Sequence, residues 1–384
     1  MKRSTERILT THTGSLPRPR DLVQMMFDKE EGQPVDQARL EDRIRSATAE
    51  VVQKQVESDV EVVSDGEVGK PGYSNYVKDR LTGFEGEGAP RHRAEWDDFP
   101  EYFQRVRQDP GLMHLKTPAC TGPVRLKDPD AVQRDIANFK AALQALGGVE
   151  PADAFMTAAS PGVIAHFLEN RYYATYEAYL AALADAMEPE YEAIVGAGFV
   201  LQLDCPDLAM SRHVGSNVGL TTEQFRGKIR QQVEALNHAV ASIPAEQLRM
   251  HLCWGNYEGP HHLDIPLKDI IDVVFSARPS AISFEACNPR HDHEWKLFEE
   301  VKLPEGKLLI PGVLDSTTNF VEHPELVAQR IVRYARLVGR ENVIAGTDCG
   351  FGTFVGRLQV DPKITWAKLQ AMAEGARLAS QELW

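Results

Sequence analysis

The sequence predicts an α/β fold and, within that class, a (β/α)8 TIM barrel. Short apolar runs of strand character alternate with segments whose apolar residues recur at helical spacing, which is typical of a parallel sheet covered by helices. Polar residues follow most strand-like runs, as they do at the C-terminal mouth of a barrel, where such folds place their sites. A barrel typically needs about 250 residues, and this chain has 384. We therefore expect a single domain over residues 1–384, with the surplus in an insertion and in extended loops.

Eight strand-like segments are expected to form the barrel, and each ends in polar or turn residues. In chain order they are residues 8–11, 60–67, 154–161, 199–206, 250–256, 282–287, 308–315 and 343–350. A ninth candidate, residues 115–120, contains Pro118 and follows a polar stretch without a helical period. A proline within a run argues against a central strand. We therefore expect an insertion over residues 70–135, between the second and third barrel strands.

Apolar residues at helical spacing mark the helices that alternate with these strands. The clearest sets are Leu40, Ile44, Ala47 and Val51; Phe225, Ile229, Val233 and Leu236; Val327, Ile331, Tyr334 and Val338; and Trp366, Leu369, Met372 and Ala376. Each set lies between two strand-like segments or after the last one, as a β/α alternation requires.

The charge balance and the cysteine usage limit the classes of partner. A formal net charge of -14 argues against a broad nucleic-acid surface and against attraction to anionic membranes. The charged N-terminus lacks the apolar core of a signal peptide, and no stretch approaches the roughly 18 apolar residues of a membrane span. The five cysteines are odd in number and widely spaced, unlike a secreted disulfide framework. We therefore expect a cytoplasmic protein with free thiols that acts on small molecules.

Three strand ends carry side chains that suit one metal ion. His251 and Cys253 are two residues apart, so both point to the same side of a strand. Glu285 and Cys349 end two later segments that a barrel brings to the same mouth. An imidazole, two thiolates and a carboxylate together suit Zn²⁺. Cys287 could replace Glu285, since it lies two residues further on and thiolate is the softer ligand; the spacing does not decide between them.

The remaining cysteines and the loop histidines are given structural interpretations. We interpret Cys120 and Cys205 as small apolar residues of the core. The pairs His261–His262 and His291–His293 could suggest a second metal site. Both pairs lie in polar loops near prolines, so we interpret them as solvated residues.

Seven motifs together resemble the C-terminal catalytic barrel of the cobalamin-independent methionine synthase family, in the family's order. They are Gly14-Ser15-Leu16-Pro17, Asp65-Gly66-Glu67, Asp204-Cys205-Pro206, His251-Leu252-Cys253, Phe284-Glu285, Gly312-Val313-Leu314-Asp315 and Asp348-Cys349-Gly350. The resemblance implies a methyltransferase of the family's single-barrel group. It also implies that the ligands of Zn²⁺ are His251, Cys253, Glu285 and Cys349.

The same resemblance implies the substrates. Glu67, Asp204 and the backbone of Gly14 and Ser15 would hold an amino-acid thiol, and His12 would either orient this substrate or cap a turn. A Zn²⁺-bound thiolate of homocysteine would take up the methyl group and become methionine, because coordination to zinc deprotonates a thiol. The methyl donor stays open between methyl-folate and a methylated corrinoid protein.

Two other functions fit parts of the pattern. The related epoxyalkane:coenzyme M transferase adds a small thiol to an epoxide at a similar zinc site, but it would need a cationic sulfonate pocket where Glu67 and Asp204 stand. A non-catalytic zinc barrel, or a barrel that partners a corrinoid protein, would have a closed metal site. Gly350 and Gly352 instead leave room for a substrate at the mouth.

Overall fold

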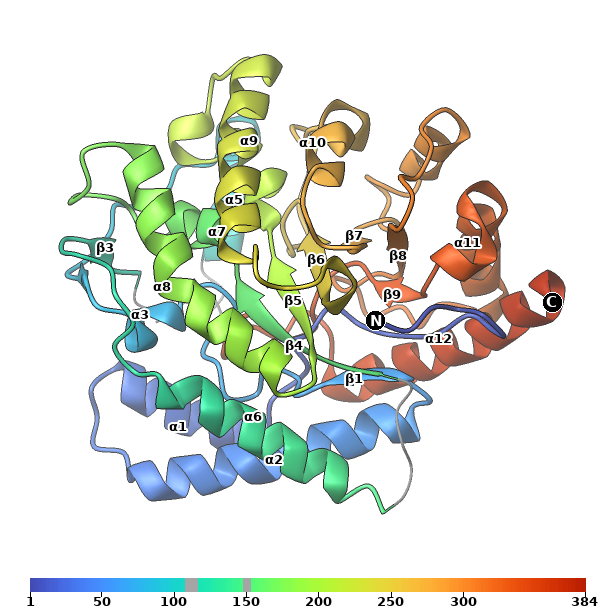
Figure 1. Ribbon diagram of the computed structural model, residues 1–384, viewed down its shortest axis with the longest axis horizontal. Coiled ribbons are helices and arrows are strands. Elements are labelled where there is room, and N and C mark those ends of the chain that lie inside the picture. The colour runs from blue at the N-terminus through green and yellow to red at the C-terminus, as the bar shows by residue number, and fades with distance from the viewer. Residues whose placement is uncertain (108–116, 148–152) are drawn as a thin grey trace.

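The computed structural model describes residues 1–107, 117–147 and 153–384 of the chain. At its centre is a parallel sheet of seven strands that curls as in a barrel, with helices outside it (Figure 1). Around the sheet the strands are β1 (Val62–Ser64), β4 (Asp153–Ala159), β5 (Val200–Asp204), β6 (Leu248–Leu252), β7 (Ala281–Phe284), β8 (Leu308–Leu314) and β9 (Gly346–Thr347). The predicted α/β class and barrel architecture are confirmed.

The start of the chain takes the eighth position of the barrel, although no full strand forms there. On one side, Ala345 N donates to Leu9 O at 2.9 Å and Thr11 N donates to Ala345 O at 2.8 Å. On the other side, Val62 N donates to Thr10 O at 2.9 Å. The segment therefore lies between β9 and β1 and closes the ring. The predicted strand at residues 8–11 is reduced to a bridge at Thr10, because only these few backbone groups meet the neighbouring strands.

Helices cover the outer face of the sheet. The α-helices outside the insertion are α1 (Arg20–Glu30), α2 (Gln37–Glu57), α6 (Asp130–Gln144), α7 (Pro161–Phe167), α8 (Tyr176–Gly196), α9 (Thr222–Ala239), α10 (Ile271–Phe275), α11 (Pro324–Val338) and α12 (Pro362–Leu383). Short 3-10 helices lie at Pro206–Leu208, Met210–His213, Gly215–Asn217, Ala245–Gln247, Leu267–Asp269, Glu294–Glu299 and Arg340–Asn342. Several helices begin after a residue whose side chain accepts a hydrogen bond from a backbone N–H group of the first turn. Before α9, for example, Thr221 forms a capping box with Gln224. In the part of the chain that the structure describes, no helix is long and apolar enough to cross a membrane.

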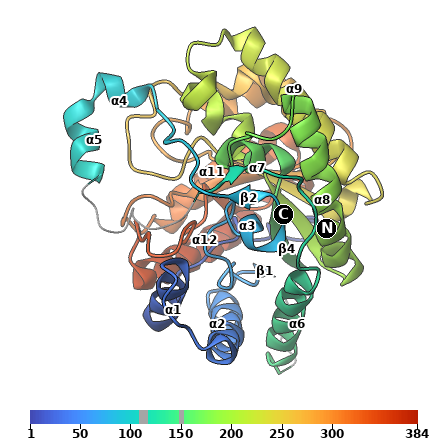
Figure 2. The same cartoon turned by 90° about the vertical axis from the view of Figure 1, so that its left-hand side faces the viewer.

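The chain leaves the barrel between β1 and β4, where the insertion is predicted. It forms α3 (Val77–Arg80), β2 (Phe84–Glu85), α4 (Glu95–Asp98), α5 (Pro100–Arg107) and β3 (Ala119–Cys120). The ninth strand candidate contributes only β3, which pairs with β2 outside the barrel; residues 115 and 116 lie outside the described residues. Because α6 begins at Asp130, the insertion ends slightly earlier than predicted. Figure 2 shows α4 and α5 set apart from α1, α2 and α6.

Side chains that point into the barrel form layers along its axis. The apolar layer at the N-terminal end of the strands consists of Leu9, Val62, Phe155, Val200, Ala281, Leu308, Ile310 and Ile344. Above it the guanidinium of Arg249 lies 3.9 Å from the centre of the Phe155 ring and donates to Thr11 Oγ1 and His12 O. Because strand residues alternate between faces, the next inward positions along the chain from Arg249 are those of His251 and Cys253. The barrel thus carries these two side chains toward its C-terminal mouth.

Candidate metal and substrate site

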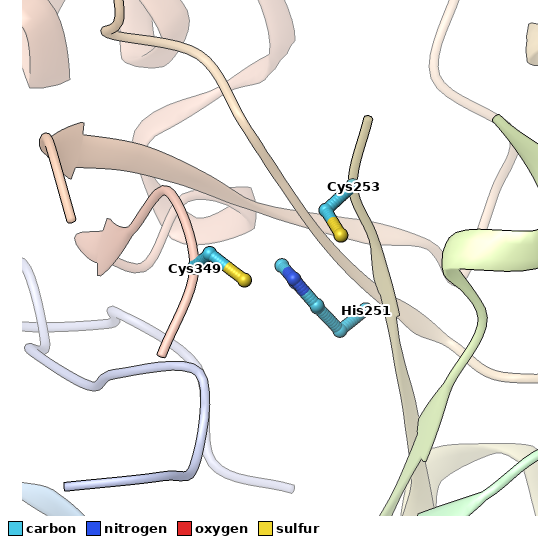
Figure 3. Close-up of side chains that lie close together, drawn as sticks. All are labelled: His251, Cys253 and Cys349. Atoms are coloured by element: carbon cyan, nitrogen blue, oxygen red, sulfur yellow. The ribbon is translucent and has the colours of Figure 1, made fainter. Parts of the chain in front are cut away.

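Three of the predicted metal ligands meet at the mouth of the barrel. His251 lies on β6, Cys253 directly follows that strand, and Cys349 follows β9. Their side chains point toward one another (Figure 3), and one ligand atom from each lies within 4.8 Å of the other two. All three are buried, with exposures of 3%, 4% and 5%. The barrel therefore brings together an imidazole and two thiols that are 98 residues apart at their extremes (349 − 251).

The imidazole of His251 has the state that a metal ligand needs. Burial lowers the pKa of His251 to about 3, and the charge of Arg249 adds to this shift, so the ring is neutral at physiological pH. Its Nδ1 lies 3.3 Å from Ser283 Oγ on the neighbouring strand, whereas its Nε2 is buried without any hydrogen bond. A hydrogen bond at one ring nitrogen commonly leaves the other free to bind a metal. The unpartnered Nε2 therefore fits a bound cation.

The two thiols depend on such a cation for their charge. A hydrogen bond with Cys349, followed by burial, raises the pKa of Cys253 well above its ordinary value. Without a metal, Cys253 is therefore a thiol at neutral pH. A divalent metal reverses this preference, because coordinating thiols lose their proton. The donor set of one nitrogen and two sulfurs is typical of zinc sites.

Glu285, the fourth predicted ligand, lies outside this three-atom group but next to it. Its Oε1 accepts a 2.8 Å hydrogen bond from Trp254 N, directly after Cys253, and its Oε2 accepts one of 2.8 Å from Asn288 Nδ2. Burial raises the pKa of Glu285 to about 7. In this geometry the carboxylate positions the loop that carries Cys253.

Cys287, the rival fourth ligand, lies in different surroundings. Burial raises the pKa of its thiol, and the charges that act on this pKa belong to Asp348, Arg330 and more distant acids. Asp348 accepts hydrogen bonds of 2.8–3.0 Å from the backbone N–H groups of Ala286, Cys287 and Asn288. Asp348 thereby fixes the β7 loop against the residue that precedes Cys349. The role of Asp348 could not be predicted, because nothing in the spacing shows which backbone amides a carboxylate will meet.

A cavity of about 380 Å³ opens beside the three ligands. Its polar walls include Ser15, Glu67 and Asp204, together with His251, Cys253 and Cys349. Aromatic walls come from Tyr73, Trp96, Phe167, Tyr257 and Phe354. Three of the four predicted metal ligands and the two predicted substrate carboxylates therefore share one cavity.

Glu67 and Asp204 are buried carboxylates with unused capacity to accept hydrogen bonds. Thr157 Oγ1 donates to Glu67 Oε1 at 2.9 Å, while Glu67 Oε2 is buried without a hydrogen bond. Asp204 accepts from Gln202 Nε2 at 2.9 Å. Burial raises the pKa of Glu67, and burial followed by the charge of Glu67 raises the pKa of Asp204 well above its ordinary value. A cationic group placed between the two carboxylates would stabilise both charges.

The loop at residues 12–15 packs directly against these carboxylates. Gly14 has a φ of +145°, and a Cβ there would lie 2.5 Å from Glu67 Oε1. Ser15 lines the cavity, whereas His12 and Gly14 stand behind it. The ring of His12 bonds to Gln55 through Nε2, and its Nδ1 accepts from Gly14 N at 3.2 Å. In this structure His12 holds the turn at Gly14, and a contact of His12 with a substrate stays a prediction.

Two arginines of the insertion line the outer part of the cavity. The Arg91 guanidinium lies 4.1 Å from the ring centre of Phe167, and that of Arg93 lies 4.8 Å from the ring centre of Tyr257. Burial lowers the pKa of Arg91 to about 10, so it stays a cation at neutral pH. The sequence carried no signal for either residue, because both belong to a stretch without regular periodicity.

The other cysteines and the loop histidines have clear positions. Cys120 and Cys205 are fully buried, and each thiol donates to a backbone carbonyl at 3.4 Å, which agrees with their interpretation as core residues. The interpretation of His291 as a solvated residue is wrong, since it is 2% exposed. Its ring bonds to Asp264 and Glu294, and His261 also bonds to Asp264. The loops after β6 and β7 pack against each other, so acidic side chains take the place of water around His291.

Comparisons with known proteins relate the whole chain to one group. No family model matches the chain. A methionine synthase of Saccharolobus solfataricus is 25% identical over 378 residues, which is 97% of this chain and 95% of the relative. A methionine synthase of Thermococcus kodakarensis is 24% identical over 376 residues, covering 97% of this chain and 94% of the relative. A solved structure with the same fold is that of a B12-independent methionine synthase from Shewanella sp. W3-18-1 in complex with selenomethionine. The TM-score is 0.72 at 18% sequence identity, and the match covers 98% of this chain and 99% of that one.

The matches extend over nearly the full length of the chain and agree with the barrel and its mouth. They define the protein as an enzyme of the methyltransferase class on a TIM barrel. Over nearly its whole length the chain is similar to methionine synthases, and its fold is that of a B12-independent one, in agreement with the resemblance that the order of its seven motifs predicts.

Proposed function

We propose that the protein transfers a methyl group to the thiol of homocysteine, giving methionine, with Zn²⁺ held by His251, Cys253 and Cys349. The observation that carries this proposal is the meeting of three metal-type ligand atoms, one of them an imidazole nitrogen without a hydrogen bond. They meet at the edge of a cavity that two carboxylates also line. The relatives named methionine synthase support the choice of reaction.

Zn²⁺ bound at this position would lower the pKa of a thiol that joins it, so that the substrate sulfur is nucleophilic at neutral pH. His251, Cys253 and Cys349 would hold the ion, and catalytic zinc sites commonly keep a place for the substrate beside three protein ligands. Glu285 is the proposed fourth ligand before the thiol arrives. Each of its oxygens keeps a lone pair beyond the hydrogen bond it accepts, and the family resemblance favours it over Cys287.

The carboxylates of the cavity would select an amino-acid thiol. Glu67 Oε2 has no hydrogen bond, and the α-ammonium of homocysteine would supply one with opposite charge. Asp204 would share the same ammonium from the end of β5, and the loop at Gly14 and Ser15 would receive the substrate carboxylate. Holding both ends of the amino acid would place the sulfur at the metal ligands and convert the encounter with the donor into an oriented reaction.

The methyl transfer itself is a displacement at carbon. The new S–C bond forms as the bond between the methyl carbon and the donor breaks, and the donor departs with that electron pair. The thiol proton leaves for solvent when the thiol binds. The aromatic walls of the cavity would exclude water and would accept a flat donor; methyl-folate and a methylated corrinoid protein are the donor classes to compare.

Arg91 and Arg93 make the addition of a sulfonate thiol to an epoxide the second candidate. They supply the cations that a sulfonate requires, on the same cavity as Glu67 and Asp204. The two candidates depend on different charged residues. A sulfonate would use the arginines of the insertion, whereas an α-ammonium would use the carboxylates of the barrel.

The proposed reaction is tested by a turnover assay with defined donors. Zinc-loaded protein is incubated with homocysteine and either methyl-folate or methylcobalamin, and methionine is measured by mass spectrometry. We expect methionine with at least one donor and none from a Cys349→Ser variant. The same protein with coenzyme M and an epoxide is the parallel assay. A thioether in that assay, with no methionine from either donor, would replace methyl transfer by the second candidate.

A further inference from the structure

A second group of metal-type ligands lies outside the site described above. It consists of Glu95 on α4, His213 at the end of the 3-10 helix Met210–His213, and Asp264 in the loop after β6. One ligand atom from each lies within 4.8 Å of the other two. Their exposures are 0%, 3% and 5%, so all three are buried. None of them belongs to the group formed by His251, Cys253 and Cys349.

The polar atoms at the centre of this group lack hydrogen bonds. Neither ring nitrogen of His213 makes a hydrogen bond of good geometry, and the same holds for Glu95 Oε1 and Asp264 Oδ1. The closest approaches are 3.4 Å from His213 Nε2 to Glu95 Oε2 and 3.8 Å from His213 Nδ1 to Asp264 Oδ1. Buried polar groups are normally satisfied, because leaving them without partners is costly. The group is therefore incomplete in its chemistry.

One oxygen of each carboxylate is held by a surrounding side chain. Asp264 Oδ2 accepts from His261 Nδ1 at 2.8 Å and from His291 Nε2 at 3.1 Å. The other oxygen of Asp264, Oδ1, faces His213 and has no hydrogen bond. Glu95 Oε2, which approaches His213, accepts from the hydroxyl of Tyr257, and Glu95 Oε1 has no hydrogen bond. Hydrogen bonds from other side chains commonly orient carboxylates that bind metal ions.

We propose that Glu95, His213 and Asp264 bind a second divalent cation, of the zinc type. One imidazole and two carboxylates are a common zinc set, and the two negative charges balance the charge of the ion. Ligand atoms about 2.1 Å from a tetrahedral zinc lie about 3.4 Å from one another, and one ligand atom from each of the three residues lies within 4.8 Å of the other two. The proposal does not depend on the reaction proposed above.

The position of this cation gives it a structural consequence for the catalytic cavity. Glu95 lies on the insertion, whereas His213 and Asp264 lie on loops of the barrel, so a shared ion would cross-link the two. Arg93, two residues before Glu95, and Trp96, directly after it, both line the substrate cavity, as does Tyr257. The cation would therefore hold the insertion over the mouth of the barrel.

The test is the zinc content of purified protein after loading with Zn²⁺ and gel filtration. We expect two zinc ions per chain in the unmodified protein and one in a Cys253→Ser/Cys349→Ser variant, whose first site is disabled. Adding His213→Ala to that double variant should remove the remaining ion and abolish the zinc-dependent rise in its unfolding temperature. His238→Asn, which changes an exposed histidine paired with Asp185, is the control and should leave one ion in the same background.

Glu95→Gln in the double variant provides a second comparison if His213→Ala fails to fold, since glutamine keeps the shape of the side chain. A folded double variant without zinc would overturn the proposal and leave His213 as an imidazolium between two carboxylates. So would an ion that persists in both the His213→Ala and Glu95→Gln forms. Loss of the first ion alone affects only the proposed methyl-transfer site, so the two proposals fail separately.

Discussion

Neutralising Glu67 should remove much of the preference for an amino-acid thiol. Glu67 is 2% exposed, its Oε1 accepts from Thr157, and its Oε2 has no hydrogen bond. Glutamine keeps the size of the side chain and an oxygen for Thr157, so the substitution mainly deletes the charge that faces the substrate. A hydrogen bond to a charged group contributes about 1.5–3 kcal/mol, which corresponds to a roughly ten- to hundredfold change in affinity. Glu67→Gln should weaken the binding of homocysteine by that factor and should leave the affinity for coenzyme M unchanged or higher.

Calorimetric titration of each thiol into the zinc-loaded protein measures this effect. We expect homocysteine to bind at least about tenfold tighter than coenzyme M to the unmodified protein, on the basis of the same hydrogen-bond magnitude. Glu234→Gln, an exposed change on α9, is the control and should preserve the difference. Metal analysis of each variant separates a lost substrate contact from a lost ion. Equal affinities of the two thiols for the unmodified protein would refute the assignment of Glu67 to the substrate ammonium.

The other predictions concern the metal, the proton, the turn and pH. Cys253→Ser and Cys349→Ser should each lose most of the catalytic-site zinc while Cys120→Ser retains it; zinc analysis that shows no difference would misplace the site. Homocysteine binding near neutral pH should release close to one proton per site, and heats that do not vary with buffer ionisation enthalpy would contradict this. Gly14→Ala should weaken the binding of homocysteine without loss of zinc, because the alanine Cβ would lie 2.5 Å from Glu67 Oε1 and would displace that carboxylate. Burial raises the pKa of Glu67, so Glu67 loses its charge, and with it its attraction for the substrate ammonium, as pH falls through that raised pKa. The affinity for homocysteine should therefore fall less steeply with falling pH in Glu67→Gln than in the unmodified protein. Equal slopes of affinity against pH in the two proteins would argue against this role of Glu67.

The parts of the site that lie on strands could be predicted from the sequence. The two-residue period of a strand places His251 and Cys253 on one face, and the order of strand ends brings Cys349 to the same mouth. The family resemblance implied that Glu67 and Asp204 belong to one substrate site, and both line the same cavity. Strand geometry is regular enough for spacing alone to carry this information.

The parts that lie in loops could not be predicted, because no period relates their positions. Arg91 enters the cavity through the irregular fold of the insertion, and Asp348 meets three backbone amides of a distant loop. Glu95, His213 and Asp264 come from three loop-rich segments that no strand order links. Polar loop composition was misleading for His291, whose partners are buried acids and not water. Tertiary contacts decided each of these positions.

In the proposed function the substrate sulfur joins the three protein ligands at the mouth of the barrel. X-ray absorption at the zinc edge measures this directly, because it counts the sulfur neighbours of the metal. The double variant His213→Ala/Glu95→Gln limits the signal to the site formed by His251, Cys253 and Cys349. Without substrate we expect two sulfur neighbours at about 2.3 Å from the zinc, the usual Zn–S distance, and with saturating homocysteine we expect three. A sulfur number that stays at two when homocysteine is bound would contradict the account.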